Sequence, residues 1–320
     1  MMLGLSKPKM IDFNKIKTYP LKERRNLVKL SDMNELNDKV EISKEKGLKE
    51  LTDAIIKANK KNKKIILMMG GHVIKTGMSR YIIDLMKKGI INHVAMNGAC
   101  SIHDFELAYI GETSEDVAEN IENGSFGMIE ETGKYLNDAI KQGAKENIGY
   151  GEAVGRMISE KKLKNKEISI LANAYELGIP ATVHVAIGTD IIHQHPSCDG
   201  AAIGKTSYQD FKIFTDSVSK MDEGVVINLG SAVILPEVFL KAITIARNLG
   251  YKVEKITAAN IDMFNHYRPR VNVVERPTSL GGKGIIIIEK HQKSVPTLYK
   301  LILEGLNAEQ NDKQHNKKIR

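Results

Sequence analysis

The sequence predicts an α/β protein with a doubly wound, mostly parallel sheet of about six strands, because short apolar runs alternate with amphipathic segments along most of its 320 residues. A clear example begins at the apolar run 65–69, which has the pattern of a strand covered on both faces and stops at Gly70 and Gly71. Apolar residues then recur at helical spacing after a candidate N-cap at Thr76, and another apolar run opens at His93. This order of strand, glycine-rich turn, helix and strand is that of a Rossmann-like βαβ unit.

The same alternation continues through the second half of the chain. After the strands at 65–69 and 93–96, we expect strands at 181–190, 224–229, 253–258 and 285–288. We expect helices at 168–177, 236–248 and 295–306, where apolar residues have helical spacing and glycine or proline marks an end. Parallel strands joined through helices form a sheet that is covered on both faces.

This pattern favours a single large domain at 47–306. Residues 1–46 are polar and basic with weak periodicity, and we expect an extension that lies over the domain. Residues 307–320 are polar, basic and without aromatic residues, which predicts a disordered tail. The segment 120–166 is helix-like but interrupted by glycines, so it is expected to cover one face or to contribute to a subunit contact.

Composition limits the classes of function. The net charge of +8 comes from 47 Lys and Arg against 39 Asp and Glu, but the chain has no Trp and no recognisable nucleic-acid motif, so we expect no nucleic-acid partner. Two cysteines, Cys100 and Cys198, lie far apart and do not suggest a disulfide framework. No apolar run approaches the ~20 residues that span a bilayer, and the first residues have too short an apolar core for a signal peptide. We therefore expect a cytoplasmic protein without a membrane partner.

Small and polar residues follow each predicted strand, at the edge where open α/β sheets bind ligands. They are Gly70, Gly71 and His72; Asn97, Gly98 and His103; Gly188, Thr189 and Asp190; Asn228, Gly230 and Ser231; and Thr257, Ala258, Asn260 and Asp262. Ordinary loops would explain one such edge but explain five together poorly. Donors for a pyrophosphate and carboxylates for ribose hydroxyls are what a dinucleotide needs, so the pattern predicts a dinucleotide site.

The order and spacing of several segments between residues 64 and 299 resemble the deoxyhypusine synthase family. The segments are KIILMMGGHVIKTG, HVAMNGACSIHDFELA, GIPATVHVAIGTD, GVVINLGSAV, KITAANID and RPTSLGGKG. The resemblance implies a homotetrameric, NAD-dependent transferase that oxidises a polyamine such as spermidine and moves its aminobutyl part to a lysine, which in the family belongs to a protein. This chain departs from the family in having no Trp, and in replacing a Lys-His-His around residues 234–236.

The resemblance also implies roles for single residues. Lys283, in Gly281-Gly282-Lys283, takes the place of the nucleophile that captures the imine. His103 replaces a family glutamate and is the expected base, because imidazole titrates near neutrality. The expected NAD contacts are His72, Thr76, Asn97, Gly98, Asp190, Gly230, Ser231, Thr257, Ala258 and Asp262. The expected substrate contacts are Asp104, His193, His195 and Glu237.

Two alternatives remain open at the level of sequence. His184, His193, His195 and Cys198 include the ligand types that Zn²⁺ prefers, which would suit a zinc-dependent hydrolase. Their spacing matches no diagnostic zinc motif, so the NAD enzyme is preferred and no metal is expected. The other alternative is a non-catalytic NAD-binding protein that keeps the fold without the chemistry.

Overall fold

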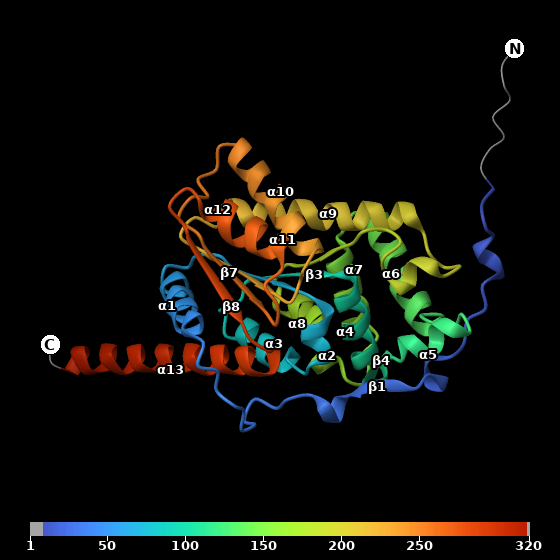
Figure 1. Ribbon diagram of the computed structural model, residues 1–320, viewed down its shortest axis with the longest axis horizontal. Coiled ribbons are helices and arrows are strands. Elements are labelled where there is room, and N and C mark those ends of the chain that lie inside the picture. The colour runs from blue at the N-terminus through green and yellow to red at the C-terminus, as the bar shows by residue number, and fades with distance from the viewer. Residues whose placement is uncertain (1–8, 319–320) are drawn as a thin grey trace, which may run out of the picture.

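The computed structural model describes the backbone of residues 9–318 and the side chains up to residue 308. Six strands form one parallel sheet in the order β5-β3-β2-β6-β7-β8, which confirms the predicted fold class (Figure 1). The strands are β2 (Ile65–Met69), β3 (His93–Asn97), β5 (Ala181–His184), β6 (Val225–Leu229), β7 (Thr257–Asp262) and β8 (Lys283–Ile288).

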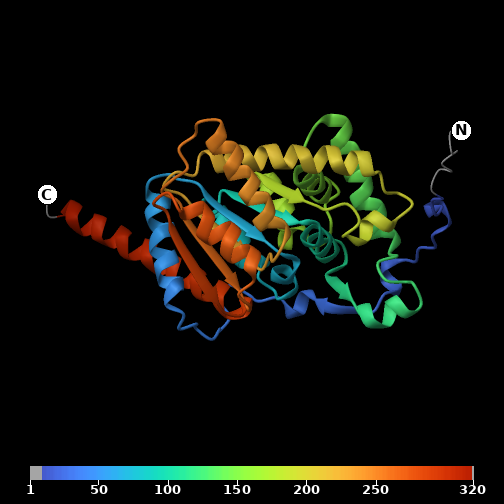
Figure 2. The ribbon, with the colours of Figure 1, turned by 45° about the horizontal axis from the view of Figure 1, so that its top comes forward.

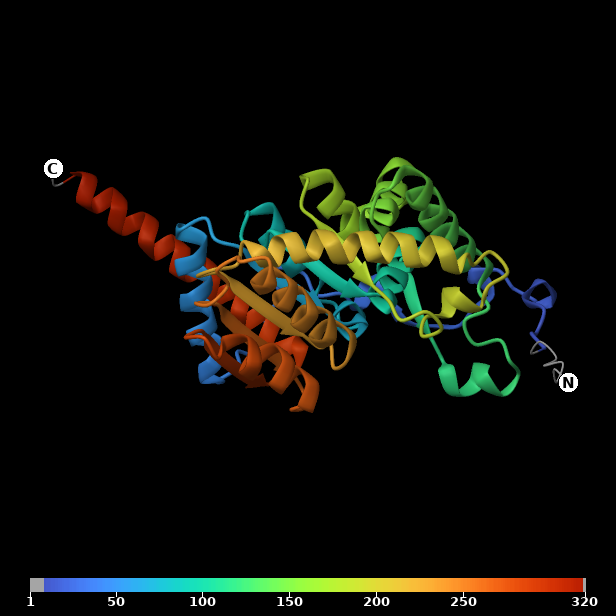
Figure 3. The ribbon, with the colours of Figure 1, turned by 90° about the horizontal axis from the view of Figure 1, so that it is seen from above.

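Helices cover both faces of this sheet. One face carries α1 (Lys46–Lys60), α3 (Ser79–Lys87), α4 (Gly98–Ile110), α8 (Ile170–Leu177) and α13 (His291–Lys318). The other face carries α10 (Ile234–Asn248) and the second half of α9 (Gly200–Ser219), which Figure 3 shows lying across the sheet. The remaining helices are α2 (Gly71–Lys75), α5 (Val117–Glu122), α6 (Glu130–Glu146), α7 (Tyr150–Glu160), α11 (Tyr267–Pro269) and α12 (Arg276–Thr278).

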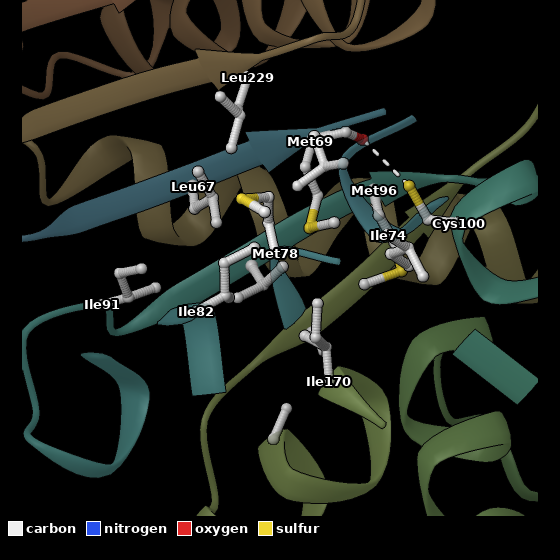
Figure 4. Close-up of a cluster of buried hydrophobic side chains, with 14 of the residues drawn as sticks. Leu67, Met69, Ile74, Met78, Ile82, Ile91, Met96, Cys100, Ile170 and Leu229 are labelled. Carbon is white, nitrogen blue, oxygen red and sulfur yellow. Dashed lines mark hydrogen bonds between the residues drawn. The ribbon is translucent and has the colours of Figure 1, made fainter. Parts of the chain in front are cut away.

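Strand β2 shows why its unbroken apolar sequence suits this position. Successive side chains of a strand point to opposite faces, so Leu67 and Met69 enter the core under α3 while Met68 enters the core under α10. The first of these cores is drawn in Figure 4, where the thiol of Cys100 donates to the carbonyl of Met69 at 3.4 Å. Cys100 is therefore a buried core residue, and burial raises the pKa of its thiol well above the usual value.

The chain reverses its direction across the sheet between β2 and β6. It runs outward from β2 to β3 and β5, then returns to place β6 on the other side of β2 and continues to β7 and β8. The helices that follow β2 and β6 leave toward opposite faces, which is the arrangement that commonly forms a crevice at the carboxyl ends of two such strands. This topological switch point is where open α/β sheets bind ligands.

The N-terminal segment has regular structure that the sequence did not predict. Strand β1 (Asn26–Lys29) pairs antiparallel with β4 (Glu112–Glu115), and Leu21 is fully buried. Figure 2 shows the segment, in blue, running along the body beside β4 and α5. The segment thus lies along the domain and contributes a strand to it.

Three expectations need correction. Strand β7 starts at Thr257 rather than at residue 253. Thr76 ends α2, and the next helix begins at Ser79. Helix α13 continues to Lys318 and projects beyond the body in Figures 1 and 3, so the tail predicted as disordered is helical up to that residue, while 319–320 lie outside the described residues. No helix within the described part of the chain is both long enough and apolar enough to cross a membrane.

Candidate functional site

A pocket of about 220 Å³ lies beside the carboxyl ends of β3 and β5 and is called here the His103 pocket. Its polar lining includes Lys75, His103, Asp190, Arg24 and Glu106. These residues come from α2, from α4, from the loop after β5 and from the N-terminal segment. The fold therefore brings together the expected base His103 and the expected cofactor ligand Asp190, which are far apart in the sequence.

Hydrogen bonds fix the tautomer of His103. The hydroxyl of Thr113 donates its hydrogen to Glu106 Oε2 at 2.6 Å. In its 2.8 Å hydrogen bond with His103 Nδ1, the Thr113 oxygen must therefore be the acceptor. Nδ1 therefore carries the hydrogen, and Nε2 keeps its lone pair. Burial lowers the pKa of His103 to about 4, and the positive charges of Lys75 and Arg24 act in the same direction. At neutral pH His103 is an uncharged imidazole with a free basic nitrogen.

Glu106 is held in place by a buried arginine. Arg24 Nη1 and Nη2 donate to the two carboxylate oxygens at 3.0 and 2.7 Å, and Thr132 donates to Oε1 at 2.8 Å. His103 and Glu106 share a face of α4 because residues three apart in a helix are neighbours. The result is a chain of hydrogen bonds from Arg24 through Glu106 and Thr113 to His103.

Asp190 packs against the first turn of α4. A Cβ atom at Gly98 would overlap Asp190 Oδ2, so only glycine leaves room for the carboxylate at this position. Asp190 Oδ2 is buried without a hydrogen-bond partner, and burial raises the pKa of this carboxyl to about 6. Gly98 thus contacts Asp190, and its predicted contact with a cofactor is not needed to explain a glycine there.

His193 supports the loop that carries Asp190. Its Nδ1 accepts from the backbone N–H groups of Gly188 at 3.0 Å and Asp190 at 3.1 Å, so the ring hydrogen must sit on Nε2. His193 Nε2 lies 3.7 Å from Asp190 Oδ2 and has no hydrogen-bond partner. Burial lowers the pKa of His193, so it is neutral and the two groups do not form an ion pair at neutral pH.

The switch point adjoins this pocket. A Cβ at Gly70 would overlap the carbonyl oxygen of Gly230, and a Cβ at Gly230 would lie 2.5 Å from His291 Nε2, so both glycines let chain segments meet closely. The rings of His72 and His291 lie 5.7 Å apart. A Cβ at Gly71 would lie 3.2 Å from His103 Cδ2, so the turn after β2 packs directly against His103.

Polar groups gather along this edge of the sheet. Buried polar atoms without partners include Asp190 Oδ2 and His193 Nε2 beside the pocket, and Asn228 Oδ1 and His291 Nδ1 near the crevice. Asp262 ends β7 at the same edge, and Ser231 follows β6. The His103 pocket by itself is smaller than the sites that hold drug-sized ligands, so it suits one ring or a small substrate, and the rest of a dinucleotide would have to lie along the crevice.

Three expected site residues lie at the opposite edge of the sheet. Thr257 and Ala258 are the first two residues of β7, and Lys283 is the first residue of β8. Lys283 is paired in the sheet with Thr257, its side chain is half exposed, and its ammonium lies 2.8 Å from a carboxylate oxygen of Glu50. Lys283 therefore does not lie at the ligand-binding edge, where its expected role as the nucleophile would need it, because its place at the start of a parallel strand puts it at the amino edge.

Several expected contacts serve the fold instead. Asp104 is buried on another side of α4, where it accepts from the backbone N–H groups of Ile170 at 2.7 Å and Leu171 at 3.2 Å and so caps α8. Glu237 lies on the surface at the first turn of α10 and pairs with Lys241. Neither side chain lines the His103 pocket.

The histidine-rich loop does not gather a metal site. His184 Nε2 lies 2.9 Å from the hydroxyl of Thr182, and its ring packs against Phe214. His195 Nε2 lies 2.8 Å from the carbonyl of Gly127, and its ring lies over Gly133, where a Cβ would overlap it. Within the described residues no three His, Cys, Asp or Glu side chains are placed to hold a metal ion. The zinc alternative is therefore not supported.

Four residues of this edge received no role from the sequence: Arg24, Lys75, Glu106 and His291. His291 follows the last predicted strand closely and could have been found by the same rule that identified the other strand ends. Glu106 is three residues after His103, which is a helical spacing. No signal in the sequence could connect Arg24 to this site, because it lies in a segment with weak periodicity and 82 residues before its partner.

Comparisons with known proteins show the fold. No family model matches the chain, and no curated protein matches it in sequence. The solved structure of AgrE in a ternary complex with ornithine and NAD⁺ resembles it with a TM-score of 0.50 and 11% identity, over 80% of this chain but only 32% of AgrE. A conserved LOR/SDH protein from Methanococcus maripaludis S2 has a TM-score of 0.49 and 17% identity, over 84% of this chain and 73% of that protein. A protein assigned as a deoxyhypusine synthase from Entamoeba histolytica has a TM-score of 0.46 and 10% identity, over 81% and 87% of the two chains.

Proposed function

We propose that this protein is an NAD-dependent enzyme that oxidises an amine, with His103 as the base that accepts a proton from the substrate. The observation that carries the proposal is the free Nε2 of His103 in a pocket at the ligand-binding edge of the sheet. The fold supports the choice of cofactor, since AgrE, which resembles the chain in fold, has been solved with NAD⁺. The sequence resemblance to deoxyhypusine synthases points to the same cofactor.

His72, Gly230, Ser231 and Asp262 would hold the dinucleotide along the crevice, with its reactive end toward the His103 pocket. When bound, NAD supplies the oxidising power by accepting a hydride from the carbon next to the amine nitrogen. The substrate ammonium must also lose one proton, and His103 Nε2 is the group placed to take it. The hydride and this proton together balance the conversion of an alkylammonium ion to an iminium ion.

The hydrogen-bond chain behind His103 prepares it for this role. The Nδ1–H bond to Thr113 fixes the ring, and Glu106 lies close enough to stabilise the imidazolium that forms. The pKa of about 4 keeps His103 unprotonated at neutral pH and able to accept a proton, but it also makes the imidazole a weaker base than one with an ordinary pKa. Transfer of an aminoalkyl group, which the family resemblance implies, would then require an acceptor amine to enter the pocket and attack the imine directly, because Lys283 lies at the other edge.

The test is the His103→Gln variant of the full-length chain, assayed for NADH formation with a panel of small amines. We expect at least a ~100-fold loss of turnover, the usual contribution of a general base, with the affinity for NAD unchanged. His266→Gln is the matched control, because His266 is exposed and lies outside the pocket. Wild-type protein that shows neither heat nor thermal shift with NAD would contradict the cofactor, and undiminished turnover in His103→Gln would contradict the base.

A further inference from the structure

The charged side chains that line the His103 pocket are not all paired. Arg24 is neutralised by its two-pronged bond to Glu106, and Glu115 lies 3.8 Å from Arg24 while accepting from the backbone N–H of Gly127 at 3.0 Å. Two groups are left over. Lys75 has no ion-pair or hydrogen-bond partner among the described side chains, and Asp190 Oδ2 is buried without a hydrogen-bond partner.

These two groups have opposite charges, yet they do not pair with each other. No contact within 4.0 Å joins the Lys75 ammonium to Asp190, although both line the same pocket. Lys75 also lowers the pKa of His103 and of His72, which shows that its charge acts on the pocket and on the crevice. The pocket is therefore lined, besides the neutral His103, by a lysine and a carboxylate that are not paired with each other.

We propose that the substrate of this pocket is a small zwitterion, an amino acid whose carboxylate binds Lys75 and whose ammonium binds Asp190. Such a ligand neutralises both unpaired groups, and desolvated ion pairs of this kind contribute through charge-assisted hydrogen bonds. A polyamine without a carboxylate would instead place a positive charge against Lys75, which costs binding energy in a poorly solvated pocket. This inference rests on the proposed amine oxidation, whose oxidised carbon would be the one that bears the amine beside His103.

A specific alternative is that Lys75 serves the phosphates of the cofactor, because α2 follows β2 at the switch point. The two roles differ in what a Lys75 variant loses. If Lys75 binds the substrate carboxylate, Lys75→Gln lowers the affinity for the amino acid and does not change the affinity for NAD. If Lys75 binds a phosphate, the same variant lowers the affinity for NAD.

The experiment compares two matched pairs of probes, lysine with cadaverine and ornithine with putrescine, which differ within each pair only by the α-carboxylate. Binding to the full-length protein is measured by calorimetry with and without NAD, and NADH formation is measured separately. We expect the amino acid of at least one pair to bind about tenfold to a hundredfold more tightly than its diamine, as for a charge-assisted hydrogen bond. Lys75→Gln should abolish that ratio, Asp190→Asn should weaken both members of the pair, and Lys49→Gln, an exposed lysine on α1, should change nothing.

Diamines that bind as tightly as their amino acids would overturn the proposal, and so would a Lys75→Gln variant that weakens NAD and amino acid alike. The two proposals fail separately. Lysine or ornithine binding that depends on Lys75 but yields no NADH would support the zwitterion site and contradict amine oxidation. Oxidation of a diamine in preference to its amino acid would do the reverse.

Discussion

Arg24 and Glu106 form a buried two-pronged ion pair that joins the N-terminal segment to helix α4, with N–O distances of 3.0 and 2.7 Å. Both side chains are almost fully buried. The pair has a double role. It attaches the N-terminal segment to the domain, and it holds the carboxylate that orients Thr113 and, through it, His103.

The first prediction concerns this pair. Replacing Arg24 with Met leaves the Glu106 carboxylate buried without its cation, and breaking a buried pair in this way costs about 3 to 5 kcal/mol. The free energy of unfolding, measured by urea denaturation, should fall by that amount. Lys29→Gln is the control, because Lys29 lies 3.7 Å from Glu112 in a more exposed pair across the β1–β4 ladder and should cost less than about 1 kcal/mol. Equal effects of the two substitutions would contradict the importance of the buried pair.

The second prediction concerns the tautomer of His103. Thr113→Val keeps the shape of the side chain but removes the hydroxyl that accepts from Nδ1, so Nε2 no longer has to be the basic nitrogen. Loss of the hydrogen-bond partner that orients a metal-binding histidine lowers activity about tenfold to a hundredfold. By analogy, we expect kcat to fall by a similar factor. The affinity for NAD should be unchanged. A nitrogen-15 spectrum of the ring should show the Nδ1–H form in the wild type and a mixture of tautomers in the variant; a mixture already present in the wild type would argue against the hydrogen-bond chain.

The third prediction is a pH dependence of stability that arises from Asp210 on α9. Its Oδ2 accepts from the backbone N–H groups of Val183 at 2.7 Å and Gly151 at 2.9 Å, and burial raises the pKa of this carboxyl to about 8 from its ordinary value of 3.8. Between these two values the folded state keeps a proton that the unfolded state has released, so a rise in pH favours unfolding.

Asp210→Asn removes this titration and keeps an oxygen that can accept both hydrogen bonds. Relative to the variant, wild-type stability should therefore fall by up to about 1.4 kcal/mol for each pH unit inside that window and change no further above it. Urea denaturation at about pH 5 and about pH 8 would measure the difference, with Asp216→Asn on the exposed side of the same helix as the control. A difference between wild type and Asp210→Asn that is the same at both pH values would contradict the assignment.

The fourth prediction concerns Lys283. Because its ammonium is paired with Glu50 at the amino edge of the sheet, Lys283→Ala should retain both NAD affinity and NADH formation. An exposed pair of this kind contributes less than about 1 kcal/mol, so the variant should also remain folded. Borohydride reduction after incubation with NAD and substrate, followed by peptide mass spectrometry, would reveal an adduct on Lys283 if the residue captured the imine after all.

The sequence was sufficient to predict the fold class and much of the edge. Apolar runs at 65–69 and 224–229 specify strands that are covered on both faces, and each of them matches a strand of the structure. Gly70, Gly230 and Asp190, which the sequence placed after strands, lie at the carboxyl edge of the sheet. The same placement failed for Thr257 because the start of β7 was set four residues too early, and a shift of that size moves a residue from one edge of the sheet to the other.

Sequence by itself thus determined most of the strands and helices of the central sheet, since the period of apolar residues depends only on local geometry. Tertiary structure decided which polar residues share the pocket. His103 is adjacent in sequence to Asp104, yet one lines the pocket and the other caps α8, because successive residues of a helix point in different directions. Arg24, Lys75, Glu106 and Asp190 meet only through the packing of α2, α4, the loop after β5 and the N-terminal segment. Their charges interact strongly there, because burial removes the water that would otherwise screen them.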